Sequence, residues 1–160
     1  MGRYVFSDNF FRFYARYIYR NMSLYEGGRY DLLKGRILSE WKGFSGRAFE
    51  EMVRALLVRE TTAQYERAGA WWNRRGDEID LLALGQQGDL AVEIKNRDLT
   101  FSEARGILSA LEKKITLVKG LSGPVRTGIA GRTVQGKEKL RAEGFSVWDL
   151  ADLGICPVRG

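Results

Sequence analysis

Two short apolar runs separated by a glycine-rich turn constrain the fold of this chain more than any other segment. Residues 78–84 read EIDLLAL, residues 90–95 read LAVEIK, and the GQQGD between them is a turn signal. A loop of two or four residues centred there gives a single register, which sets these pairs opposite each other: Leu84 and Asp89, Leu82 and Ala91, Asp80 and Glu93. Both arms are apolar on both faces apart from a few charges, which predicts a hairpin inside a sheet.

The charges within this hairpin form an unusual set. Two carboxylates that face each other across a strand pair repel, so Asp80 opposite Glu93 destabilises the sheet. Lys95 falls on the same face as Glu93, because side chains alternate with period two. Each charge alone has an ordinary explanation, since Glu78 and Lys95 can form a cross-strand ion pair and Asp80 can mark a strand entry. Their conjunction, enclosed by apolar runs, favours a site with a cation between the two acids.

Composition narrows the chemistry that is available. The 160 residues contain no histidine, which excludes Ser-His-Asp and Cys-His systems and the usual zinc sites. Carboxylates, lysine and a metal bound through oxygen remain. The single cysteine, Cys156, has no partner for an internal disulfide, which fits a reducing cytosol. Charges interrupt the first 20 residues, and no apolar run approaches the roughly 20 residues of a membrane span. We therefore expect a cytoplasmic protein without membrane contact.

The net charge of +6 is distributed unevenly. Residues 1–50 and 101–160 each carry an excess of positive charge, whereas residues 51–100, which contain the hairpin, carry an excess of negative charge. An anionic partner such as DNA, with a local acidic pocket for a cation, fits this distribution. A positive charge that only aids solubility fits it as well.

The remaining segments predict helices and strands in alternation. Helices are expected at 9–20, 30–41 and 45–60, with Gly43–Gly46 dividing the last two. Thr100 and Glu103 form a capping-box pattern that opens another helix, which Gly120 ends. From residue 45 the predicted order is α-β-β-β-α-β-α-β, with the last three elements at 125–130, 136–143 and 145–149. This order indicates an α/β domain over residues 45–160, preceded by an aromatic-rich helical extension over residues 1–44.

Asp80 and Glu93 are sufficient for the inner shell of Mg²⁺ or Mn²⁺, because such an ion takes one or two carboxylates and keeps its waters. The backbone carbonyl of Ile94 is a further candidate ligand. Lys95 is expected to hold the attacking water or the phosphate, and Glu50 can reach the site from its helix. Candidate phosphate contacts flank the acidic residues: Arg74, Arg75 and Arg97.

Some neighbouring residues favour a less specific interpretation. One or both of Trp71 and Trp72 are expected to be core residues, with stacking on bases as the alternative. Lys113 and Lys114 are expected on a solvated helix face.

A resemblance covers nearly the whole chain, and its motifs are Gly46-x-x-Phe49-Glu50, then Trp72 with the run EIDLLA, then AVEIK. These motifs resemble the PD-(D/E)XK nuclease superfamily, most of all the carboxy-terminal nuclease-like domain of archaeal AAA-type ATPases. The segment SDNFFRFYARYIYRN is similar to a D-x-F-x-R-F-W segment of that domain, with Tyr14 in place of the tryptophan. Ile79 stands where the superfamily's name has proline, and the chain contains no G-x-x-x-x-G-K-[ST] phosphate loop.

The resemblance implies a restriction-endonuclease-like core, in which helices flank a central mixed sheet of four strands. It also implies that Asp80, Glu93 and Lys95 match the catalytic signature and that Glu50 matches a frequent helix acid. The leading hypothesis is thus a Mg²⁺- or Mn²⁺-dependent DNA endonuclease. The alternatives are a catalytically idle domain that docks on an archaeal ATPase or binds DNA, and a basic nucleic-acid binder without catalysis. Expected partners are DNA, an AAA-type ATPase domain or a second copy of the chain.

Overall fold

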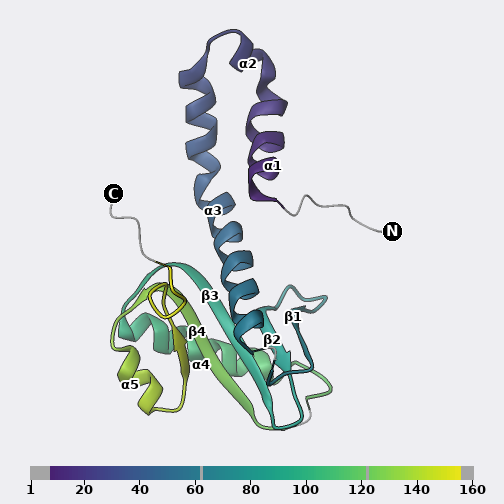
Figure 1. Cartoon of the computed structure of the whole chain (residues 1–160), viewed down its shortest axis with the longest axis vertical. Coiled ribbons are helices and arrows are strands. Elements are labelled where there is room, and N and C mark those ends of the chain that lie inside the picture. Colours follow the sequence, from purple (N-terminus) through teal and green to yellow (C-terminus); the bar gives the residue numbers. More distant parts are fainter. Residues whose placement is uncertain (1–7, 62, 122, 156–160) are drawn as a thin grey trace. The chain divides into compact units, whose positions relative to one another are not determined.

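A computed structural model describes residues 8–61, 63–121 and 123–155 of the chain (Figure 1). The chain divides into two compact units, one ending at Ala48 and the other beginning at Phe49. The long helix α3 (Tyr30–Thr61) runs from the first unit into the second. No helix within these described ranges combines the length and the apolar character that a bilayer crossing needs.

The amino-terminal unit is built from helical segments around a small aromatic cluster. Asp8 caps α1 (Asn9–Phe13) by accepting from the backbone N–H groups of Phe10 and Phe11. The helical path continues through a π-helical turn, a 3₁₀ turn and α2, which occupy Tyr14–Ile18, Tyr19–Asn21 and Met22–Glu26. Glycines then reverse the chain, with Gly28 at a φ of +66°.

Four rings pack together in this unit: Phe13, Tyr17, Trp41 and Phe44. Of the aromatic residues in the helix predicted at 9–20, Tyr17 is buried, whereas Phe10 and Tyr14 are exposed. Packing within this unit therefore covers only part of the aromatic surface that the sequence displays.

The prediction of two helices divided at Gly43–Gly46 is wrong. Helix α3 is continuous through both glycines, and a Cβ added at either position would meet no atom within 4 Å beyond the helix's own neighbouring backbone. Each glycine weakens a helix by about 1 kcal/mol relative to alanine but does not force it to end. From Phe49 onward, buried residues of α3 pack on the sheet, and this packing outweighs the local penalty.

The second unit contains one mixed sheet of five strands in the order β1-β2-β3-β4-β5. The first three strands pair antiparallel, and β4 and β5 join in parallel. The strands are β1 (Arg67–Trp72), β2 (Glu78–Leu84), β3 (Asp89–Leu99), β4 (Val125–Val134) and β5 (Ser146–Trp148), with helices α4 (Phe101–Ile115) and α5 (Lys137–Ala142) in between. The predicted order of elements is confirmed, and the sheet has one strand more than the four that the resemblance implies.

Helices cover both faces of this sheet. On one face, Phe49, Val53 and Leu57 of α3 form a core with Val92 and Ile94, among other strand residues. On the other face lies α4, whose Thr100–Glu103 capping box is present as predicted. Figure 1 shows α4 running behind β3 and β4. The helix ends at Ile115 rather than near Gly120.

Candidate functional site

The pairing of β2 with β3 stops next to the acidic residues. The ladder joins Leu81 to Val92, Leu82 to Ala91 and Ala83 to Leu90, which confirms the predicted register at Leu82 and Ala91. One step further, the backbone N–H of Ile94 donates to the Asp80 carboxylate, at 2.7 Å from Oδ2. A buried backbone N–H needs an acceptor. The Asp80 side chain therefore takes the place of a strand carbonyl, which fixes its position against β3.

A β-bulge contributes to this arrangement. In the pairing of β1 with β2, Gly69 is opposite Leu82 and Trp71 is opposite Ile79, so β2 supplies one residue more than β1 between these pairs. The extra residue lies in the segment that contains Asp80. Bulges bend a strand and re-aim its side chains, and they are frequent beside active sites. The Asp80 carbonyl accepts a hydrogen bond from Arg54 of α3 at 3.3 Å.

Lys95 joins the two carboxylates. Its Nζ lies 2.7 Å from Glu93 Oε2 and 3.4 Å from Asp80 Oδ2. Glu93 is buried, and Asp80 exposes 13% of its side chain. The alternative in which Lys95 pairs with Glu78 is not what the structure contains, since the ion pairs of Lys95 within the described part of the chain are with Asp80 and Glu93. The structure thus brings Asp80, Glu93 and Lys95 together, while their catalytic roles stay predictions.

Lys114 is a fourth member of this cluster, and the prediction that it lies on a solvated face is wrong. Its ammonium pairs with Glu93 Oε1 and donates to the Glu78 carbonyl at 2.8 Å. The spacing along α4 offered a signal, because Lys114 follows the buried Leu111 by three residues and therefore lies on the same side of the helix. A long lysine stem can run along apolar surface and deliver its charge to a partner.

The pKa values of the two acids in the cluster shift in opposite directions. Burial raises the pKa of Asp80 to about 6, despite the hydrogen bond from Ile94 and the charge of Lys95. Burial also acts on Glu93, but hydrogen bonds from Lys114 and Lys95 outweigh it and lower the pKa of Glu93 below its usual range. Burial disfavours the charged form of Lys95, yet the bond to Glu93 and the charge of Asp80 raise its pKa. One carboxylate is thus held ionised, and the other titrates close to neutrality.

The carboxylates of the cluster suit a divalent cation that keeps most of its waters. Within residues 8–61, 63–121 and 123–155, no group of three or more His, Cys, Asp or Glu side chains is arranged to hold a metal ion. Two carboxylates already share one ammonium group at this edge of the sheet. Two are what Mg²⁺ takes from a protein when water supplies its other ligands. The residues therefore fit a hydrated Mg²⁺ or Mn²⁺ ion and do not form a closed cage.

The other predicted residues lie around this cluster at different places. Glu50 belongs to α3, the helix on the face opposite Lys114 and α4, and its role stays a prediction. Arg74 and Arg75 are exposed in the turn between β1 and β2. Arg97 is exposed and pairs with Glu103 of the capping box at 3.0 Å. The contact of each arginine with phosphate also stays a prediction.

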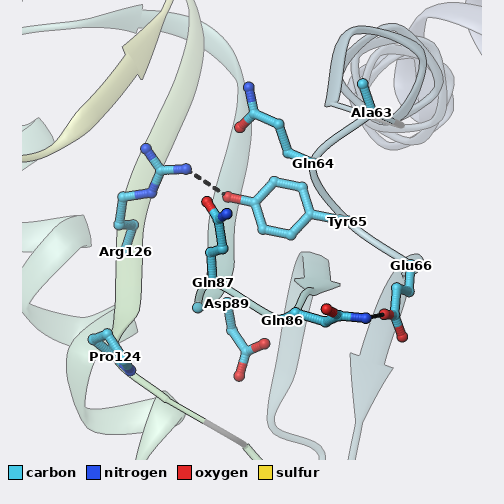
Figure 2. Close-up of a pocket in the computed structure, with 10 residues that line it drawn as sticks. Ala63, Gln64, Tyr65, Glu66, Gln86, Gln87, Asp89, Pro124 and Arg126 are labelled. Carbon is cyan, nitrogen blue, oxygen red and sulfur yellow. Dashed lines mark hydrogen bonds between the residues drawn. The ribbon is translucent and has the colours of Figure 1, made fainter.

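A pocket of about 720 Å³ lies elsewhere, at the turn between β2 and β3 (Figure 2). Arg126 donates to the Tyr65 hydroxyl across it at 2.8 Å, and Gln86 donates to Glu66 at 2.7 Å. Asp89, which lines the pocket, precedes Glu93 by four residues of an extended strand, or about 13 Å. The pocket is therefore separate from the acidic cluster.

The fold and the cluster together define the class of protein. It is an α/β domain with two carboxylates and a lysine at the point where β2 and β3 stop pairing. The chain belongs to the family DUF234, described as archaea bacterial proteins of unknown function, whose family model matches residues 14–107. It is 34% identical over 145 residues to the "Uncharacterized protein MJECL04" of Methanocaldococcus jannaschii. That match covers 86% of this chain and 32% of the relative, so the chain spans about a third of that protein's length.

Two solved structures resemble part of the chain. One is described as a repair endonuclease from Pyrococcus abyssi, with a TM-score of 0.39 and 17% identity over 60% of this chain and 44% of that one. The other is an EndoMS-dsDNA2 complex, with a TM-score of 0.34 and 14% identity over 58% of this chain and 41% of that one.

Proposed function

We propose that this chain is a nuclease domain that hydrolyses phosphodiester bonds of DNA with the help of Mg²⁺ or Mn²⁺. The observation that supports this most strongly is the meeting of Asp80 and Glu93 on a single ammonium group, that of Lys95. Two carboxylates that converge on one positive charge provide a position where a divalent cation is favoured. The excess of basic residues in the chain is consistent with an anionic substrate.

Each residue of the cluster has a role in this proposal. Asp80 and Glu93 would hold the cation, with the carbonyl of Ile94 as a further ligand. When bound, the cation would polarise the phosphate and favour ionisation of a water molecule. Lys95 would orient that water or bind a phosphate oxygen, and Glu50 would assist from α3. Arg74, Arg75 and Arg97 would hold the phosphates of the flanking nucleotides.

The nuclease proposal is tested by comparing three proteins on supercoiled, linear, branched and single-stranded DNA with Mn²⁺ or with EDTA. These are the wild type, Glu93→Gln and the control Glu78→Gln, which neutralises an exposed glutamate of the same hairpin. We expect metal-dependent cutting by the wild type and the control, and its loss in Glu93→Gln. Calorimetry with Mn²⁺ should show binding heat in the same two proteins. No cutting of any substrate, together with no binding heat in the wild type, would contradict the proposal.

A second candidate function is a docking module that keeps the fold while the cluster is idle. The exposed rings of the amino-terminal unit favour it, because Phe10 and Tyr19 each expose 69% of their surface. An AAA-type ATPase domain or a second copy of the chain would be the partner. Sedimentation of the wild type beside a Phe10→Ser, Tyr19→Ser double variant tests self-association. If both proteins sediment as monomers at all concentrations, the second copy is excluded as a partner.

A further inference from the structure

The hairpin of β1 and β2 ends in a tightly hydrogen-bonded turn. Asn73 organises it: its Oδ1 accepts from the N–H of Arg75 at 2.8 Å and from that of Asp77 at 3.1 Å. Its Nδ2 donates to the Asp77 carboxylate at 2.8 Å, and its backbone N–H donates to the Asp77 carbonyl at 3.0 Å. Gly76 adopts a φ of +89°, which favours glycine. This turn holds Arg74 and Arg75 on the outside of the hairpin.

An exposed tryptophan lies directly before that turn. Trp72 exposes 70% of its surface, whereas its neighbour Trp71 packs on the core formed by Ile79, Leu111 and other residues. Successive strand residues point to opposite faces, so the core that buries Trp71 leaves Trp72 outside. A tryptophan that a strand holds in water offers a flat apolar surface to a flat ligand. The prediction that at least one of the two tryptophans is a core residue is confirmed by Trp71, whereas Trp72 lies outside the core.

Trp72 is close to the acidic cluster along the sheet. Trp72 is paired with Glu78, whose carbonyl accepts from Lys114, and Lys114 also contacts Glu93. Asp80 follows Glu78 by two residues, about 7 Å along an extended strand. Adding the spacing between paired strands, the Trp72 backbone lies on the order of 10 Å from the Asp80 backbone. A nucleic-acid strand covers that length in a few nucleotides.

Resting on the proposed function, we infer that Trp72 stacks on an unpaired base next to the cleaved phosphodiester, while Arg74 and Arg75 hold phosphates of the same strand. The faces of bases inside a duplex are covered by their neighbours, so an aromatic side chain reaches them where bases are unpaired. The substrate class is therefore single-stranded DNA, or duplex DNA with a single-stranded branch or end. An exposed aromatic ring beside arginines is the combination that single-strand binding uses.

The test measures binding in EDTA, so that it does not depend on cleavage. A fluorescein-labelled oligonucleotide, single-stranded or annealed into a duplex, is titrated with the wild type, Trp72→Ala, Trp72→Phe and Tyr19→Ala. Tyr19 is the matched control, because its ring is as exposed as that of Trp72 but lies in the other unit. Circular dichroism and thermal melting establish that each variant is folded.

We expect Trp72→Ala to bind the single strand roughly ten- to hundred-fold more weakly, since stacking on one base contributes a factor of that order. Trp72→Phe should retain most of the affinity, and Tyr19→Ala should bind like the wild type. A salt titration separates the two kinds of contact. Trp72→Ala should leave the salt dependence unchanged, whereas an Arg74→Ala, Arg75→Ala double variant should reduce its slope.

The inference is overturned if Trp72→Ala binds the single strand as tightly as the wild type, or if it weakens binding to the single strand and to the duplex equally. Its failure is distinguishable from failure of the proposed function. If the protein never cuts DNA but Trp72→Ala still weakens its binding to the single strand, the nuclease proposal is contradicted and the inference about Trp72 is retained. Metal-dependent cutting that Trp72→Ala retains in full on every substrate contradicts the stacking alone.

Discussion

Replacing Asp80 by asparagine measures the free-energy cost of holding a charge at the edge of the sheet. Burial raises the pKa of Asp80 from its ordinary value of 3.8 to about 6 in the folded protein. One pKa unit corresponds to about 1.4 kcal/mol, so ionised Asp80 lowers the free energy of unfolding by about 3 kcal/mol. The side chain is only 13% exposed, so solvent screening leaves most of this cost in place.

The sign follows from proton binding. Between pH 3.8 and about 6 the folded chain binds more protons at Asp80 than the unfolded chain does, so stability falls as pH rises through this window. Asparagine does not titrate, and its Oδ1 can still accept the hydrogen bond from the N–H of Ile94. We therefore expect Asp80→Asn to match the wild type near pH 3.8 and to exceed its stability by about 3 kcal/mol above pH 7.

Urea denaturation in EDTA, repeated from pH 4 to pH 8, measures this difference. Glu78→Gln is the control, because it removes an exposed carboxylate from the same strand. Its effect on stability should stay small and constant across the pH range. The reasoning is refuted if Asp80→Asn and the wild type differ by the same amount at every pH, or if the variant is the less stable protein at pH 8.

Two further pairs of substitutions test packing in the second unit. Lys114→Met removes a charged hydrogen bond to the buried Glu93 and should lower the free energy of unfolding, measured by urea denaturation, by about 2 kcal/mol. Lys113→Met, on the exposed side of the same helix, should change this free energy little. Gly128→Ala would bring a Cβ to 2.9 Å from the Trp148 ring and should cost about 1–3 kcal/mol in thermal melting. Gly106→Ala, where a Cβ meets no atom within 4 Å, should be neutral or stabilising; equal losses at both glycines would contradict this packing argument.

Patterns that depend on neighbouring residues were predictable from the sequence. The hairpin register follows from alternation and the length of the turn, and the pair of Leu82 with Ala91 confirms it. The capping box at Thr100 and Glu103 is a local hydrogen-bond pattern, and it too is present. The convergence of Asp80, Glu93 and Lys95 follows from the same register, because each lies at the same end of a paired strand.

Features that depend on distant packing were not predictable in the same way. The continuity of α3 through Gly43 and Gly46 depends on tertiary contacts that local propensity does not contain. The contact of Lys114 with Glu93 needs the placement of α4 on the sheet, which brings together two residues 21 positions apart in the chain. The bulge at Asp80 is visible only when β1 is paired with β2. These non-local features determine the pKa values and the side-chain orientations in the acidic cluster.

The hydrogen bond from Ile94 to Asp80 makes one backbone amide a built-in sensor of the cluster. That amide is buried and donates its hydrogen bond to the carboxylate itself. Protonation of Asp80, or binding of a cation to it, therefore changes the acceptor of this hydrogen bond. In a ¹⁵N-labelled sample titrated with diamagnetic Mg²⁺ instead of Mn²⁺, the Ile94 amide resonance should shift along one path. It should shift along a different path as the pH is lowered. A single peak can thus read the state of the acid directly, without a substrate or a dye.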